Sequence, residues 1–184
     1  MSYRRLPLVA VVLSLAVLSC SPSSLIPRGL SYPGQFSELV DDLNTWMRSV
    51  NRLDADIQNL AVPLAGNPLT AAYILTVIDA GAPTLMSQAD WEDFTRPLLT
   101  ALSSDITSVS EQGFTLQARL EVLRPPDDLR TFHNELITCI KAQVDRARGV
   151  EELLRMGSTS RQIDGSACDN WQASLDALQA ASPP

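Results

Sequence analysis

The 184-residue chain is poor in the side chains that most catalytic and metal-binding motifs require, and its only histidine is His133. One histidine excludes the His-Glu-x-x-His zinc motif, and the segment Phe132-His133-Asn134-Glu135 does not match the Glu-x-x-His units of di-iron bundles. The sequence also has no Gly-x-Ser-x-Gly elbow, glycine-rich phosphate loop or EF-hand loop. We therefore expect no catalytic residue, no metal site, no cofactor and no enzymatic activity.

His133 lies at the edge of an apolar helical stripe, beside Phe132 and one turn before Ile137. We interpret it as a hydrogen-bonded structural histidine near the Pro125-Pro126 turn. An enzyme that pairs His133 with a carboxylate is the least favoured of three hypotheses, because adjacent acids on a helix usually form a solvated face. The candidate acids are Asp41-Asp42, Asp127-Asp128 and Glu151-Glu152.

Positive charge is scarce as well. The formal net charge is −7, and the first 19 residues hold two arginines and no acid, so residues 20–184 carry −9. Lys141 is the only lysine. An acidic surface repels phosphate backbones and anionic headgroups, which argues against nucleic acid as a partner and against membrane attachment through a basic patch.

The N-terminal segment has the order of a secretory signal peptide. Arg4-Arg5 precedes an apolar run from Leu6 to Leu18, and small residues follow. This run is shorter than the roughly 20 residues that a membrane-spanning helix needs. We therefore expect a signal peptide over residues 1–19 rather than a retained span.

The segment Val17-Leu18-Ser19-Cys20 resembles the lipobox of bacterial lipoproteins. In that family the cysteine thiol receives a diacylglyceryl group, the chain is cut before it, and the new amine is often acylated by a fatty acid such as palmitate. The resemblance implies lipidation at Cys20 and an anchor on the outer face of the cytoplasmic membrane or in the outer membrane. Two or more acyl chains give stable anchoring. The alternative is an ordinary secreted protein in which Cys20 is incidental.

Residues 20–34 are rich in proline, serine and glycine and show no periodicity, which is typical of a tether. We expect a domain over residues 35–181, followed by a short tail over 182–184. Within this domain, Cys139 and Cys168 are the remaining cysteines. Outside the cytoplasm such a pair is more often bridged than free, so we favour a disulfide over a buried thiol pair or a metal site.

Apolar residues recur every three or four positions in four segments, and this spacing predicts amphipathic helices. The segments run from Phe36 to about Leu60, from Leu69 to Ala80, from about 88 to 123, and from Pro126 to Met156. Ser87 is the expected N-cap of the third helix, Pro97 predicts a kink near Asp93, and Gly113 is a candidate break. A short last helix would carry Trp171. No strand pattern is present, so we predict an all-α antiparallel bundle of four to five helices.

Three functions fit this sequence. We favour a lipid-anchored envelope protein that has a structural role or binds another envelope protein. The second hypothesis is a lipoprotein that binds a small apolar ligand between its helices, because residues 69–80 are apolar nearly all round. We prefer to interpret that segment as a buried connector. The third hypothesis is the enzyme that uses His133.

Overall fold

The computed structural model describes residues 32–66, 68–81, 83–161, 168–171 and 173. Within these residues the chain is helical and contains no strand, which confirms the all-α prediction. The elements are α2 (Tyr32–Ser37), α3 (Val40–Ala65), α4 (Pro68–Ala80), α5 (Gln88–Glu121), the short 3₁₀ helix η1 (Asp127–Leu129) and α6 (Arg130–Met156). Helix α2 begins three residues before the expected start of the domain at residue 35.

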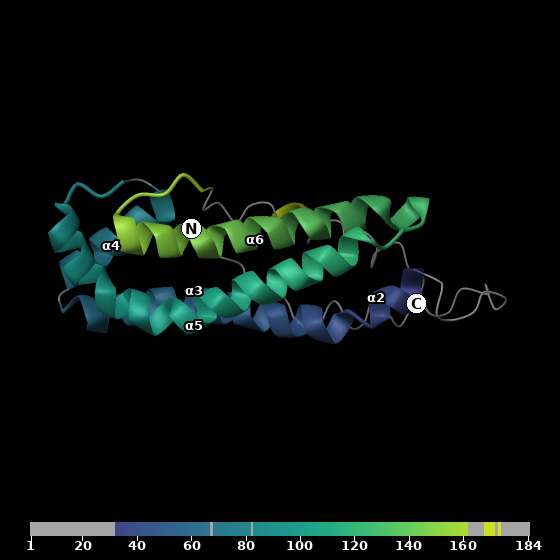
Figure 1. Ribbon diagram of the computed structural model, residues 1–184, viewed down its shortest axis with the longest axis horizontal. Helices are drawn as coiled ribbons and strands as arrows, with labels where there is room; N and C mark the ends of the chain where they lie inside the picture. Colours follow the sequence, from purple (N-terminus) through teal and green to yellow (C-terminus); the bar gives the residue numbers. More distant parts are fainter. Residues whose placement is uncertain (1–31, 67, 82, 162–167, 172, 174–184) are drawn as a thin grey trace.

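Three long helices form an elongated bundle, with α5 antiparallel to both α3 and α6 (Figure 1). Helix α2 lies at one end of this bundle, and α4 lies at the other. The core is continuous along the bundle and contains Trp46, Trp91 and Leu120 among its most buried side chains. Trp46 and Trp91 also satisfy their polar atoms, because Trp46 Nε1 donates to Val109 O at 3.0 Å and Trp91 Nε1 donates to Leu153 O at 2.8 Å.

Local sequence signals explain several helix boundaries. The Ser87 side chain accepts a hydrogen bond from Asp90 N at 3.3 Å and donates to Asp90 Oδ2 at 2.6 Å, so it is the expected N-cap of α5. Helix α3 continues through Pro63 and ends at Gly66, whose φ of 73° is in the left-handed region that favours glycine.

Helix α5 runs through both Pro97 and Gly113 without interruption, and Figure 1 shows a bend in its N-terminal part. A bend in this part of α5 is the expected effect of Pro97 inside the helix. Gly113 does not break the helix. It lies where α5 packs against Trp46 and Val144.

Candidate functional site

His133, the only histidine, is buried near the first turn of α6 and is 3% exposed. Its ring is hydrogen-bonded to the backbone of Leu120 in the last turn of α5. Burial lowers the pKa of His133 below its ordinary value of 6.5, and the Leu120 bond opposes this shift. This environment favours a neutral imidazole that holds two helices together.

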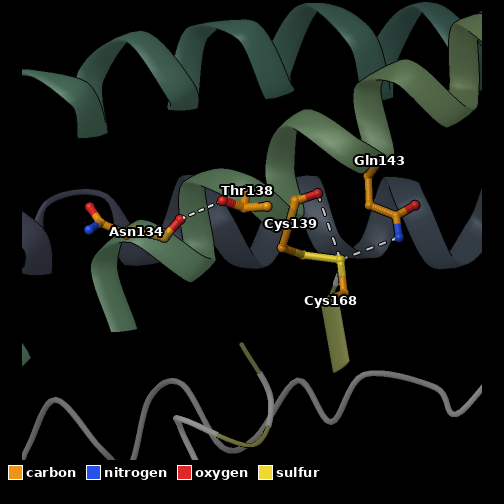
Figure 2. Close-up of a disulfide and its surroundings, with 5 residues drawn as sticks. All are labelled: Asn134, Thr138, Cys139, Gln143 and Cys168. Atoms are coloured by element: carbon orange, nitrogen blue, oxygen red, sulfur yellow. Dashed lines mark hydrogen bonds between the residues drawn. A yellow bond between two sulfur atoms is a disulfide. The ribbon is translucent and has the colours of Figure 1, made fainter. Parts of the chain in front are cut away.

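Cys139 and Cys168 form a disulfide that attaches residues 168–171 to α6 (Figure 2). Gln143, one turn after Cys139, donates its side-chain amide to Cys168 Sγ at 3.4 Å. Trp171 then packs against Phe132 with a ring separation of 6.2 Å, and Phe132 contacts Phe36 of α2 at 6.0 Å. The disulfide therefore holds residues 168–171 against α6. Trp171 of this segment packs on Phe132, a residue of α6 that also contacts α2. Cys20 lies outside the described residues.

The adjacent acids named in the sequence do not gather into one cluster. Asp41 and Asp42 are exposed in the first turn of α3, Asp127 and Asp128 are exposed in η1, and Glu151 and Glu152 are half-buried in α6. Within the described residues, no group of three or more histidine, cysteine or acidic side chains could hold a metal ion.

A carboxyl pair that the sequence did not reveal lies between α3 and α5. Asp105 is nearly buried, and its carboxyl group is hydrogen-bonded to Asp56, while Arg52 lies 3.4 Å from Asp105 and 3.7 Å from Asp56. Burial raises the pKa of Asp105 above its ordinary value of 3.8, and Asp56 adds to the rise, whereas Arg52 opposes it. A second interhelical ion pair joins Asp54 of α3 to Arg146 of α6.

Helix α4 is buried on one side only. Ala71, Ile74, Val77 and Ile78 face the core, whereas Leu69 is 83% exposed. The interpretation of residues 69–80 as a buried connector therefore holds for one face of the helix. An open hollow of about 450 Å³ lies elsewhere, along α5. Its lining is polar and consists of Ser103, Ser104, Thr107, Ser108, Glu111 and Gln112.

Large apolar side chains are exposed at the α4 end of the bundle. Leu69 of α4 is 83% exposed, Leu85 of the α4–α5 loop is 94% exposed, and Met156 at the end of α6 is 52% exposed. We call these three residues the apolar end. Exposed apolar side chains are common as single residues, but three of them on adjoining elements form a candidate interaction surface.

Specific contacts hold these elements together. Tyr73, one turn after Leu69 on α4, accepts a hydrogen bond from Leu85 N at 2.7 Å and is hydrogen-bonded to Thr84 Oγ1 at 3.0 Å. Thr84 N donates to Gly157 O at 2.7 Å, next to Met156. The loop is thus attached to both α4 and α6, so the apolar end is built on fixed backbone. Sequence periodicity could not reveal it, because Leu85 lies in a loop.

A continuous segment of the chain at the α4 end of the bundle contains acidic side chains and no basic ones. From Leu53 to Thr95, the chain contains no lysine, arginine or histidine. This segment contains six acids: Asp54, Asp56, Asp79, Asp90, Glu92 and Asp93. It forms the C-terminal half of α3, all of α4 and the first turns of α5. The sequence alone shows that these 43 positions contain no basic residue. Only the fold shows that the C-terminal half of α3, α4 and the start of α5 lie at the same end of the bundle (Figure 1).

No described helix is long and apolar enough to cross a membrane. No family model matches the chain, and no curated protein or solved structure is significantly similar to it.

Proposed function

We propose that the chain is a lipid-anchored protein of the bacterial cell envelope that acts by contact with another envelope protein. The lipid would be carried by Cys20, and the helical domain would present a binding surface at a distance from the membrane. The lipobox resemblance of residues 17–20 supports the anchor, and the exposed residues of the bundle support the contact.

One observation carries the contact part of the proposal. Tyr32, the first described residue, lies in α2 at one end of the bundle, whereas the apolar end lies beyond α4 at the other (Figure 1). Helix α3, with 26 residues at 1.5 Å each, spans roughly 40 Å between them. A chain tethered at α2 therefore holds its exposed leucines far from the point of attachment, where a partner protein has access.

Cell fractionation of Cys20→Ala tests the anchor. We expect the parent protein in the membrane fraction with an acylated N-terminal cysteine by mass spectrometry, and we expect the variant in the soluble extracytoplasmic fraction or retained as an uncut precursor. Ser21→Ala is the matched control and keeps membrane association. An unmodified N-terminus on protein that is soluble without detergent would refute the anchor.

Site-specific photocrosslinking in living cells tests the contact. A photoreactive amino acid is placed at exposed positions along the bundle, namely 69, 85, 114 and 122. We expect at least one position to give a reproducible adduct with a second envelope protein. If all four positions give no protein adduct across growth conditions, the contact function is wrong.

A further inference from the structure

We propose that the apolar end binds a cationic amphipathic segment of another protein, a segment whose apolar side chains are flanked by lysine or arginine. This inference rests on the proposed contact function and names the chemistry of the partner. Its basis is the coincidence of exposed apolar side chains with three exposed acids, Asp79, Asp90 and Glu92, which the described ion pairs do not include.

Asp54, Asp56 and Asp93 are paired with Arg146, Arg52 and Arg96, which leaves Asp79, Asp90 and Glu92 as the acids of this segment outside the described ion pairs. Arg96 is paired with Asp93 at 3.1 Å, and Arg155 is paired with Glu151 at 2.8 Å. Asp79 in the last turn of α4 and Glu92 in the first turns of α5 are exposed, and the described ion pairs of this end do not include them. The potential at the apolar end is therefore negative, and it attracts a partner of positive charge.

The same charge argues against two other occupants. A surface of anionic phospholipid would be repelled by the exposed acids. A second copy of this chain would bring an equally acidic end into contact, at the cost of like-charge repulsion. An amphipathic cationic helix fits this surface better, because its apolar face covers the leucines and its basic residues pair with the acids at the rim.

The fixed backbone also suits this kind of partner. The Tyr73, Thr84 and Gly157 hydrogen bonds hold Leu85 between α4 and the end of α6. A partner helix therefore meets a surface that is already ordered and does not have to order the loop when it binds. Binding then loses less conformational entropy.

Photocrosslinking from position 85 of the full-length lipidated chain tests this inference, with position 122 as the control. Val122 is 76% exposed and lies at the opposite end of α5. We expect an adduct from position 85 that mass spectrometry maps to a partner segment with apolar residues at helical spacing and two or more lysines or arginines. Position 122 should not give this adduct.

Charge reversal then separates electrostatic from purely apolar binding. We expect Asp79→Lys combined with Glu92→Lys to reduce the position-85 adduct about fivefold or more, whereas the exposed Asp127→Lys and Asp128→Lys pair in η1 leaves it unchanged. Leu69→Ser should reduce it by a similar factor, because it removes apolar contact area from the apolar end. Immunoblots and thermal melts confirm equal amounts of folded protein.

Several outcomes would overturn the inference. They are an adduct with phospholipid, with a second copy of the chain or with an acidic segment, and an adduct that the charge reversal does not change. Adducts from positions 114 or 122 with none from 85 would also overturn it while leaving the contact function standing. Absence of protein adducts from all positions would remove both proposals.

Discussion

Gly113 of α5 faces Val144 of α6 so closely that a Cβ atom on the glycine would lie 2.4 Å from Val144 Cγ2. It would also lie 3.0 Å from Trp46 Nε1, whose hydrogen bond to Val109 O joins α3 to α5. The three long helices therefore meet at one point where only glycine fits. This explains why a residue of low helix propensity occurs in the middle of a 34-residue helix.

Gly113→Ala should lower the free energy of unfolding by about 1–3 kcal/mol, because overpacking outweighs the roughly 1 kcal/mol gain in helix propensity. Urea denaturation followed by circular dichroism measures this. The double variant Gly113→Ala with Val144→Ala should be more stable than the sum of the two single effects predicts, because the clash is removed. Simple additivity would show that the two residues do not interact.

The helices could be predicted from the sequence because each depends on local periodicity. The expected segments correspond to α3, α4, α5 and α6. Ser87 is the N-cap of α5, as its position three residues before Asp90 indicates. The partners across helices could not be predicted in this way. The sequence alone suggests a break at Gly113. The glycine is needed for its close contact with α6, and the pattern within one helix does not contain that contact.

An acidic residue on the apolar stripe of a helix is the sequence signal that predicts a charge pair between helices. Asp105 lies between Leu102 and Ile106 on the buried side of α5, a position at which a carboxyl group needs a partner. The identity of that partner depends on how α3 and α5 are aligned, which tertiary packing decides. The Cys139–Cys168 pair was easier to predict, because the choice was limited to two cysteines once Cys20 was assigned to the lipid.

His133 should make the protein less stable in mild acid. Burial lowers the pKa of the folded-state imidazole below 6.5, so the unfolded chain binds the proton more readily. Stability is therefore complete above pH 6.5 and falls as the pH drops below it. In His133→Gln, which keeps a side-chain amide donor, the fall between pH 7 and 5 should be smaller than in the parent. Equal slopes would refute this assignment.

Asp105, in contrast to His133, should make the protein more stable as the pH falls. Its folded-state pKa is raised above 3.8, so the folded chain binds the proton more readily and stability is gained as the pH falls toward that range. Asp105→Asn mimics the protonated acid, and we expect it to match or exceed the parent at pH 7, by up to about 1 kcal/mol. The control Asp127→Asn removes an exposed acid outside the group formed by Asp105, Asp56 and Arg52, and it should not give this gain in stability. A loss of more than about 1 kcal/mol in Asp105→Asn would show that Arg52 dominates the site.

The disulfide should contribute substantially to stability because it closes a loop with a sequence separation of 29 residues. Cys139→Ala with Cys168→Ala should lower the free energy of unfolding by about 3–4 kcal/mol on the chain-entropy model. Tryptophan fluorescence should also change in the native state as Trp171 leaves Phe132. A reducing agent should reproduce the loss in the parent and have no effect on the double variant; equal sensitivity of both would contradict the prediction.

The ion pair between Asp54 and Arg146 is asymmetric, and this decides which substitution costs more. The Arg146 side chain is 6% exposed, whereas that of Asp54 is 26% exposed. Asp54→Ala leaves a buried guanidinium without its carboxylate, which we expect to lower the free energy of unfolding by about 3 kcal/mol. Arg146→Met replaces the buried cation with an apolar side chain of similar length and leaves an acid that water can reach, so the expected loss is below about 1 kcal/mol. Urea denaturation of the two variants gives the order directly. The reverse order would mean that Arg146 is needed for its other contacts more than for this pair.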